Sequence, residues 1–303
     1  MRLVKALISN ETDDEIGFEV LGSLSRLELA TYDPGVAELS QEQQQAEVLI
    51  APYRSSLRPI RLLPLLPKLR MVQLLSAGVD EWASRVPTTV NLVGARGAHA
   101  GPVSEWVLSA ILAQLRAWPT LVRFQDQGIW AHRRFEADTL QGKKALIVGA
   151  GSIGTLVAHR LAAFGATATL VAKNARPGVY SSDDLLSLLS GHQIVVVCAP
   201  LTTETDGLID AKFLAAMDDG ALLVNVGRGR IVDTNALVDE LNRERIRAAL
   251  DVTEPEPLPE GHPLWQCPGL LLSPHSARTV PGTNRLCYEV AARHIEEFLS
   301  SES

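Results

Sequence analysis

The stretch Ala145-Leu-Ile-Val-Gly-Ala-Gly-Ser-Ile-Gly154 decides the fold of this 303-residue chain. A short apolar run leads directly into Gly-x-Gly-x-x-Gly, which is a dinucleotide-binding fingerprint when it follows a strand and opens a helix. Gly149 permits a tight turn, Gly151 lets the backbone approach a pyrophosphate, and Gly154 lets the helix lie close to the strand. The N-terminus of that helix then binds the phosphates.

The flanking sequence supports this interpretation. Residues 145–148 are apolar and short enough for a buried parallel strand. Apolar residues then recur at helical spacing from Ile153 to Phe164, where Gly165 follows as a C-terminal cap. Residues 168–172 predict the next strand. The alternative is a purely structural glycine turn, and the strand and helix around it favour the binding interpretation.

The residue that contacts the adenosine ribose is expected about 20 residues past the glycines, at the end of the second strand. In this chain it is Lys173, followed by Asn174 and Arg176. An acidic residue would accept a hydrogen bond from a free 2′-hydroxyl, whereas these side chains offer donors and positive charge to a 2′-phosphate. The sequence therefore favours NADP over NAD. The alternative is that Lys173 and Arg176 are ordinary solvated loop charges.

Composition restricts the class of protein. With 46% hydrophobic residues, the chain is globular and long enough for two domains with substantial cores. The formal net charge of −7 disfavours a general binder of nucleic acid or of anionic membranes. No stretch approaches the ~20 apolar residues needed to cross a bilayer. The first residues read as a strand, without the apolar core or cleavage signature of a signal peptide.

The cysteines indicate a reducing compartment. Cys198, Cys267 and Cys287 are an odd number and contain no Cys-x-x-Cys pair. Neither a disulfide framework nor a zinc site is suggested by this pattern. We therefore expect a cytoplasmic location and no metal site.

Short apolar runs alternate with polar or helical segments, which is typical of α/β folds with doubly wound parallel sheets. We expect two Rossmann-like or flavodoxin-like domains with a cleft between them. Residues 1–97 plus 279–303 would form a discontinuous substrate domain, and residues 98–278 a dinucleotide-binding domain with five or six parallel strands. Helices are predicted from Pro102 to near Trp118 and from residue 281 to 300. The predicted strands are 3–8, 27–32, 48–52, 71–75, 90–93, 145–148, 168–172, 194–199, 221–226, 248–252 and 270–273.

Three charged residues follow successive predicted strands, where ligands bind in open α/β sheets. Arg228 follows residues 221–226, Glu256 lies after residues 248–252, and His275 follows the last strand. Taken singly, each also has a structural explanation: Arg228 in a solvated turn, Glu256 in an exposed loop, and His275 as a structural histidine. Their joint appearance after a dinucleotide fingerprint predicts a catalytic set.

At this point the chain resembles the D-isomer-specific 2-hydroxyacid dehydrogenase family, which includes glyoxylate and hydroxypyruvate reductases. The matching motifs cover most of the chain in the expected order, so this signal is far more specific than the glycines alone. They are Ser76-Ala-Gly-Val-Asp80, Val103-Ser-Glu-Trp106, Gly149-Ala-Gly-Ser-Ile-Gly154, Ala199-Pro-Leu-Thr202, Glu204-Thr-Asp-Gly-Leu208, Asn225-Val-Gly-Arg-Gly229, Ala249-Leu-Asp-Val252, and His262-Pro-Leu-Trp265 leading to Ser273-Pro-His275.

The resemblance implies roles for the three charged residues. Arg228 would hold the substrate carboxylate and polarise the adjacent carbonyl with a planar, permanently charged group. His275, protonated, would give its proton to the carbonyl oxygen while the nicotinamide delivers hydride to carbon. Glu256, preferred over Glu254 by its spacing from Asp251, would orient the imidazole and favour its charged form.

The resemblance also implies binding positions outside the catalytic set. The backbone amides around Gly78 and Val79 would contact the substrate carboxylate, together with Arg228. The alternative for Gly78 and Val79 is an ordinary strand-to-helix turn. Tyr53, Arg54 and His99 occupy corresponding loop positions and would shape specificity. The expected cofactor-binding residues are Gly149, Gly151, Ser152, Ile153, Gly154, Lys173, Asn174, Arg176, Pro200, Thr205, Val226, Asp251, His275 and Ala277.

Three positions bear on the branch of the family. Arg278 stands where a glycine is common, which suits either a more acidic substrate or a solvent-facing side chain. Lys173 replaces the ribose-binding acid, and Glu256 argues against the formate-oxidising branch, which uses glutamine there. We expect an NADP-preferring 2-keto-acid reductase of the glyoxylate/hydroxypyruvate type. The resemblance implies a homodimer formed through the nucleotide domain, and residues 121–142, rich in arginine and aromatic residues, suggest an arm that packs on the second subunit. The alternatives are a cofactor-sensing regulator of the same fold and a dehydrogenase of an oxyanion such as phosphite.

Overall fold

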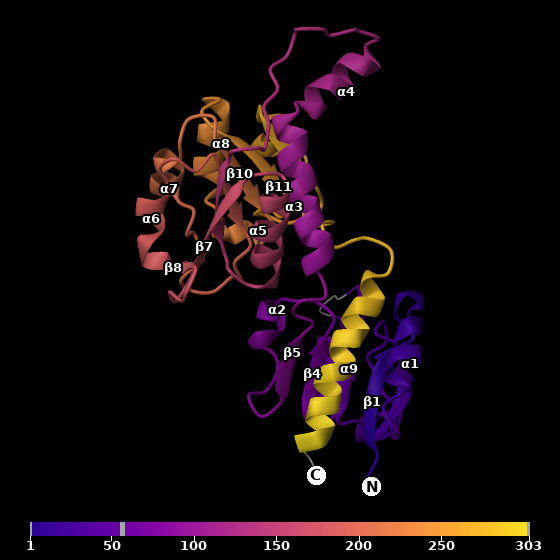
Figure 1. Ribbon diagram of the computed structural model, residues 1–303. Coiled ribbons are helices and arrows are strands. Elements are labelled where there is room, and N and C mark those ends of the chain that lie inside the picture. Colours follow the sequence, from indigo (N-terminus) through magenta and orange to yellow (C-terminus); the bar gives the residue numbers. More distant parts are fainter. Residues whose placement is uncertain (1, 55–57, 302–303) are drawn as a thin grey trace. The chain divides into compact units, whose positions relative to one another are not determined.

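The computed structural model describes residues 2–54 and 58–301, and the chain divides into two compact units (Figure 1). Unit 1 comprises residues 1–99 and 280–303, and unit 2 comprises residues 100–279. Each unit is built on one parallel sheet, which confirms the expected α/β fold class. Within the described ranges, no helix combines the length and the apolar character needed to span a membrane.

Unit 1 has a five-stranded sheet with the order β2-β1-β3-β4-β5, the flavodoxin-like arrangement. Helices α1 (Glu15–Leu21) and α9 (Thr283–Ser301) pack together over one apolar face of the sheet. The other face is covered by η3 (Arg58–Leu65) and α2 (Asp80–Ala83). The short turns η1 (Thr12–Asp14) and η2 (Gln43–Gln45) connect these layers. The strands are β1 (Val4–Ser9), β2 (Leu27–Tyr32), β3 (Val48–Ile50), β4 (Met71–Leu74) and β5 (Asn91–Gly94).

Unit 2 has a seven-stranded sheet with the order β12-β11-β10-β9-β6-β7-β8, and every neighbouring pair is parallel. The sequence predicts five or six strands, with ranges for six of the seven that the structure has. The missed strand, β8, has three residues and no apolar run, so periodicity could not reveal it. The strands are β6 (Lys144–Val148), β7 (Thr167–Ala172), β8 (Val179–Ser181), β9 (Ile194–Val197), β10 (Leu222–Asn225), β11 (Arg247–Leu250) and β12 (Leu270–Leu272).

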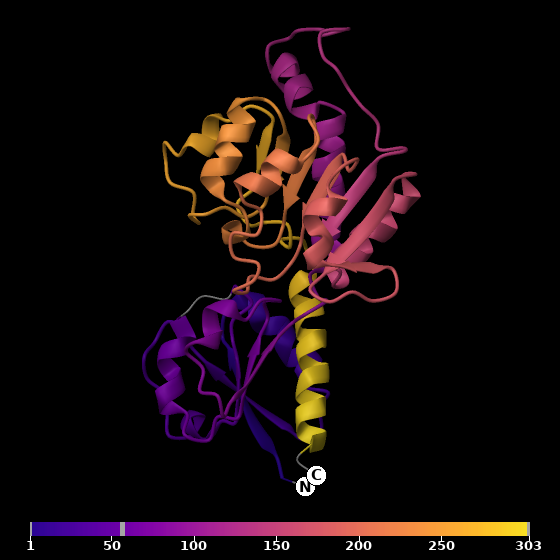
Figure 2. The same cartoon turned by 90° about the vertical axis from the view of Figure 1, so that its left-hand side faces the viewer.

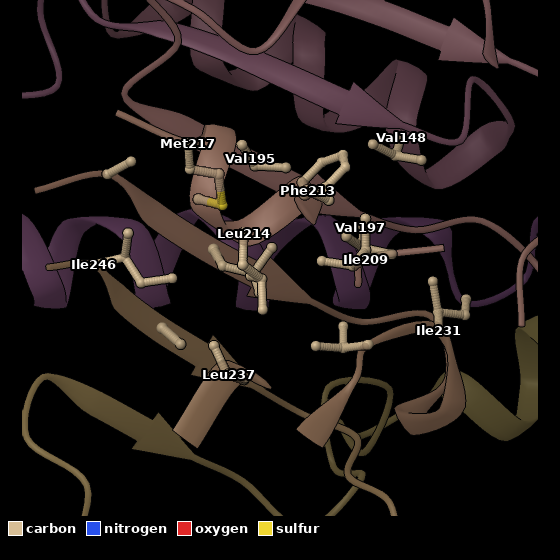
Figure 3. Close-up of a cluster of buried hydrophobic side chains, with 14 of the residues drawn as sticks. Val148, Val195, Val197, Ile209, Phe213, Leu214, Met217, Ile231, Leu237 and Ile246 are labelled. Atoms are coloured by element: carbon tan, nitrogen blue, oxygen red, sulfur yellow. The ribbon is translucent and has the colours of Figure 1, made fainter. Parts of the chain in front are cut away.

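Both faces of this sheet are buried, which is why its central strands β9 and β10 are apolar at every position except Asn225, the last residue of β10. Helices α3 (Ala100–Leu115) and α5 (Ser152–Ala163) pack against each other and cover one face. On the other face lie α6 (Leu185–Leu188), α7 (Ala211–Ala216) and α8 (Thr234–Asn242). Figure 3 shows the core under these helices, where Phe213 of α7 and Leu237 of α8 lie among side chains of the sheet such as Val195.

The helix expected to reach Trp118 ends earlier. α3 stops at Leu115, and Ala117 adopts a left-handed backbone with φ 54°, after which Trp118 begins a second helix, α4 (Trp118–Asp126). Pro119 supports this new start, because proline is favoured in the first turn of a helix. Figures 1 and 2 both show α4 and the chain that follows it standing away from the sheet of unit 2.

Candidate active site

The candidate residues of unit 2 gather along one edge of its sheet. Because the seven strands are parallel, their carboxyl ends lie on the same edge. The chain turns back at the pair β6 and β9, since β7 and β8 lie on one side of it and β10 to β12 on the other. Ligands of open α/β sheets bind in the crevice at such a switch point. The glycine-rich loop begins there, at the end of β6.

The three fingerprint glycines have distinct surroundings. Gly149 has φ +117°, and a Cβ on it would lie 2.7 Å from the backbone of the Cys198–Ala199 segment after β9. A Cβ on Gly154 would overlap the carbonyl oxygen of Gly149, so only glycine lets α5 approach the strand this closely. In contrast, a Cβ on Gly151 would meet nothing within 4 Å. Open space at Gly151 is what a bound group needs.

The N-terminus of α5 is available as well. Gly151 is the N-cap residue, and no side chain caps the helix, whose first residues are Ser152 and Ile153. Four backbone N–H groups of a helix start lack intrahelical acceptors, and they attract anions. The space beside Gly151 and this uncapped end therefore fit the pyrophosphate of a dinucleotide.

The three residues expected at the ribose follow β7 and are exposed. Lys173 Nζ lies 2.6 Å from Oε1 of Glu204, in the loop after β9. This ammonium, the largest cause, lowers the pKa of Glu204 to about 2. Arg176 donates from Nη2 to the carbonyl oxygen of Ala150, inside the glycine-rich loop, at 2.7 Å. Positive charge is thus present beside the loop, but Lys173 already has an anionic partner.

Glu256 and His275 form a direct ion pair. Nδ1 of the imidazole donates to Oε1 of Glu256 over 2.7 Å, and both side chains are about two-fifths exposed, at 41% and 40%. The hydrogen bond from His275 is the main reason that the pKa of Glu256 is lowered, and the charge of Arg228 acts in the same direction against partial burial. The carboxylate therefore stays ionised and fixes the tautomer of the ring, leaving Nε2 for chemistry.

The turn after β10 positions Arg228. Asn225 accepts from the N–H of Gly227 with Oδ1 and donates from Nδ2 to the carbonyl oxygen of Arg228, both over 3.0 Å. A Cβ on Gly229 would overlap the carbonyl group of Thr253, in the loop that leads to Glu256. Gly229 thus allows the loops after β10 and β11 to touch. This contact brings the loop of Arg228 next to the loop of Glu256, whose carboxylate is affected by the charge of Arg228.

Asp251 holds the loop that carries His275. The carboxylate is 3% exposed and accepts from the N–H groups of Ser276 and Ala277 at 2.8 and 3.1 Å, and from the hydroxyl of Ser273 at 2.5 Å. Its carbonyl oxygen accepts from the N–H of His275, whose φ is 51°. The carboxylate expected at the cofactor is therefore engaged with this loop.

The remaining cofactor positions differ in exposure. Pro200 and Thr205 belong to the loop after β9, where the Thr205 hydroxyl donates to the Pro200 carbonyl at 2.7 Å. Val226 and Ala277 are buried, at 9% and 4% exposed. Asn174 lies between Lys173 and the turn of Arg176 and is exposed.

A hollow of about 400 Å³ adjoins the Glu256–His275 pair. Its wall is mostly apolar and includes Leu258, Trp265 and Leu272. Apolar walls around a few convergent polar groups are typical of sites for small ligands. No group of three or more His, Cys, Asp or Glu among residues 2–54 and 58–301 is arranged to hold a metal ion.

The expected substrate-binding residues of unit 1 lie at the carboxyl edge of its own sheet. Tyr53 follows β3, and Gly78 and Val79 follow the neighbouring strand β4 and open α2. The N–H of Tyr53 donates to Oδ1 of the buried Asp14 over 2.8 Å. This edge therefore has a defined backbone arrangement.

Two other loop residues of unit 1 have partners within it. Arg54 pairs with Asp13 at 2.6 Å. His99 is buried, with Nε2 3.1 Å from Sγ of Cys287 on α9. Arg278, in unit 2, is half-buried, so its side chain does not face solvent completely.

Sequence reasoning gave no role to Glu204 or Ser273. Glu204 stands within a quoted motif, but its partner Lys173 is 31 residues away, directly after β7, a strand that β6 separates from β9. Only the strand order brings the two together. Ser273 carried a weak signal, since it comes directly before the Pro-His pair at a strand end.

The family model, the related sequences and the solved structures all point to one family of dehydrogenases. The family model described as D-isomer specific 2-hydroxyacid dehydrogenase, NAD binding domain, matches residues 108–277. Glyoxylate/hydroxypyruvate reductase HPR3 of Arabidopsis thaliana is 31% identical over 251 residues, which cover 79% of this chain and 76% of that protein. D-3-phosphoglycerate dehydrogenase of Methanocaldococcus jannaschii is 28% identical over 99% of this chain, but the match spans only 58% of that longer protein.

A solved structure extends the similarity to the whole fold. The crystal structure of a D-isomer specific 2-hydroxyacid dehydrogenase from Xanthobacter autotrophicus Py2, in complex with NADPH and MES, matches with a TM-score of 0.84 at 27% identity. The match covers 99% of this chain and 96% of that chain.

Proposed function

The chain belongs to the D-isomer-specific 2-hydroxyacid dehydrogenase family, and on this basis we propose that it reduces small 2-keto acids to 2-hydroxy acids with NADPH. Membership makes it an oxidoreductase that uses a nicotinamide cofactor and acts on CH–OH donors. The finer statement, a reductase of the glyoxylate/hydroxypyruvate type, is supported by the similarity to HPR3.

The observation that carries the proposal is the 2.7 Å ion pair between Glu256 and His275, with the charge of Arg228 acting on the same carboxylate. A carbonyl reduction requires a proton donor for the oxygen and a cation that holds the carboxylate beside it. The two needs are met by residues at the ends of β12 and β10, strands of one sheet edge.

We assign the steps to these residues as follows. Arg228 binds the substrate carboxylate through its planar guanidinium and draws electron density from the neighbouring carbonyl. Imidazolium Nε2 of His275 donates a proton to the carbonyl oxygen, and Glu256 at Nδ1 stabilises the ring while it is charged. A bound nicotinamide supplies the hydride that reduces the carbonyl carbon. In the oxidative direction, His275 accepts the hydroxyl proton.

The cofactor is assigned to unit 2. The glycine-rich loop and the α5 N-terminus would hold the pyrophosphate, and Lys173 with Arg176 would favour a 2′-phosphate, hence NADP before NAD. The part of Tyr53, Gly78 and Val79 of unit 1 in substrate binding stays a prediction from the sequence. The three cysteines are free, which supports a reducing, cytoplasmic location.

A homodimer is proposed from α4 and the chain that follows it. Trp130 is 91% exposed there, and Trp118 is 55% exposed. A hollow of about 530 Å³ is lined by Trp130 together with Leu121, Phe124 and Phe135. Exposed aromatic groups around a hollow are typical of a protein interface.

The decisive experiment follows oxidation of NADPH, and separately of NADH, by absorbance with glyoxylate, hydroxypyruvate, pyruvate and phenylpyruvate. We expect turnover with at least one keto acid and a higher kcat/KM with NADPH. Arg228→Lys, which keeps the charge but not the planar group, and His275→Ala should lower kcat/KM by roughly 10²-fold or more while cofactor fluorescence still reports binding. Cofactor binding without turnover on any keto acid would refute the reductase assignment.

A further inference from the structure

The pair Lys173–Glu204 bridges the carboxyl end of β6. Lys173 follows β7 and Glu204 lies in the loop after β9, and these two strands flank β6 in the sheet. The Nζ–Oε1 distance is 2.6 Å. The glycine-rich loop begins at the end of β6, so the ion pair is placed beside the segment that would hold a dinucleotide.

The loop itself also holds Glu204. Oε2 accepts from the Thr203 hydroxyl at 3.3 Å, and the backbone N–H of Glu204 donates to Oγ1 of Thr202 at 3.3 Å. The Thr202 N–H in turn donates to the Thr205 hydroxyl at 2.8 Å. The carboxylate is therefore kept near Lys173 by its own turn as well as by the ammonium, and with a pKa lowered to about 2 it is ionised at every working pH.

This carboxylate opposes a 2′-phosphate. If the phosphate displaces Glu204 from Lys173, an existing ion pair is lost, and if both anions contact the ammonium, they repel each other. Arg176 offers only partial relief, because one of its amino groups already donates to Ala150. A free 2′-hydroxyl has no such conflict, since a carboxylate is the acceptor that it normally uses.

We propose that Glu204 is a specificity-determining residue: it weakens the binding of NADP relative to NAD by competing with the 2′-phosphate for Lys173 and by offering an acceptor to a free ribose hydroxyl. The proposal rests on the proposed function, because it requires a nicotinamide dinucleotide in unit 2. It predicts a milder NADP preference than Lys173 alone would give.

The test measures binding without catalysis. Isothermal titration of the full chain with 2′,5′-ADP and with 5′-ADP compares two fragments that differ by the 2′-phosphate. For Glu204→Gln, we expect Kd for 2′,5′-ADP to fall about 2- to 5-fold, the range for removal of one solvent-exposed like charge. Kd for 5′-ADP should stay the same or rise, and the gain should shrink at high salt.

Two further variants make the result specific. Asp206→Asn removes the same charge two residues away, but its partner is Arg230, so it should leave the ratio of the two Kd values unchanged. In a Lys173→Met background, Glu204→Gln should lose most of its effect, because the ammonium that it frees is absent.

An unchanged ratio in Glu204→Gln, or equal tightening for both fragments, would overturn this inference. If the wild-type chain binds both fragments and reduces keto acids in that case, the proposed function stands without it. If the wild type binds neither fragment nor either dinucleotide, the proposed function fails as well.

Discussion

The Glu256 carboxylate and the His275 ring lie partly in solvent, so their ion pair alone adds little to stability. The interaction instead orients the imidazole ring of His275. Nδ1 is tied to a carboxylate whose pKa is lowered, and the ring consequently presents Nε2 in a fixed direction. A group with a lowered pKa keeps its charge as pH falls, until pH reaches that lowered value. The Glu256 carboxylate is thus ionised across the whole neutral range and remains an acceptor for Nδ1.

Glu256→Gln tests that role. The amide still accepts from Nδ1, but it no longer favours a charged ring. We expect kcat for keto-acid reduction to fall about 10- to 100-fold at pH 8, with a smaller loss at pH 6, because reduction needs the imidazolium. The pH–rate profile checks this: its alkaline limb should move to lower pH. A profile that keeps its shape while kcat falls would contradict the electrostatic part of the role.

Asp14 in unit 1 shows the opposite shift. It is fully buried, and Oδ1 accepts from the Tyr53 N–H and from the Tyr288 hydroxyl, both at 2.8 Å. Burial is the largest cause that raises its pKa above the ordinary 3.8. The folded state then binds the proton more readily than the unfolded one, so Asp14 makes stability fall as pH rises from about the unfolded pKa through the raised one.

Asp14→Asn retains an acceptor oxygen for both donors but has no charge to bury. We would measure the free energy of unfolding in urea at pH 4, 5, 6 and 7. In the variant, we expect this free energy to lose the fall with rising pH that Asp14 causes in the wild type. For one proton, the two slopes can differ by at most about 1.4 kcal/mol per pH unit. Glu15→Gln, an exposed neighbour, is the matched control. Parallel pH curves for wild type and Asp14→Asn would argue against the effect.

At the scale of elements, the sequence was informative where one local pattern determines one structure. The β6–α5 unit follows from its apolar run and its three glycines, each with a steric requirement visible in the structure. The sequence prediction placed the end of α3 too late, because apolar residues continue past Ala117. The left-handed backbone of Ala117 ends the helix, and an alanine gives no sign of that conformation. The Lys173–Glu204 pair depends on strand order, a non-local property that no window of sequence contains.

α4 and its following chain carry the proposed dimer contact. Trp130→Ser removes the most exposed aromatic group there, and we expect the dimer dissociation constant to rise roughly 30-fold, the scale of an interface residue worth about 2 kcal/mol. Sedimentation velocity over a concentration series checks this. Tyr180→Ser, on the exposed strand β8, is the control and should leave the constant unchanged. A wild type that is monomeric at all concentrations would refute the dimer.

At the scale of the molecule, unit 2 is contiguous and unit 1 is not. Both core clusters of unit 2 draw only on residues 103–277. One core of unit 1 instead combines strands from the first hundred residues with α9, whose Tyr288, Ala291 and Ile295 are fully buried. The two units should therefore respond differently to loss of α9.

Removal of the chain from Val280 onward should abolish the unfolding transition of unit 1 and preserve that of unit 2. Calorimetry should show one cooperative transition in the shortened protein, since a core without a helix that buries several large side chains loses well over the ~5–15 kcal/mol that stabilises a domain. Binding of 5′-ADP reports on unit 2 in the same sample. Two retained transitions would contradict this view of the core.

The interrupted sequence of unit 1 also has a consequence for synthesis on the ribosome. Strands β1 to β5 emerge first, yet the helix that seals one apolar face follows only after all of residues 100–279 has been translated. During that interval unit 2 is able to fold, whereas the nascent β1–β5 sheet has only α1 over an apolar face that α1 and α9 cover together in the folded unit. Until α9 has been translated, we expect the apolar surface that α9 will bury to be the part of unit 1 most prone to aggregation.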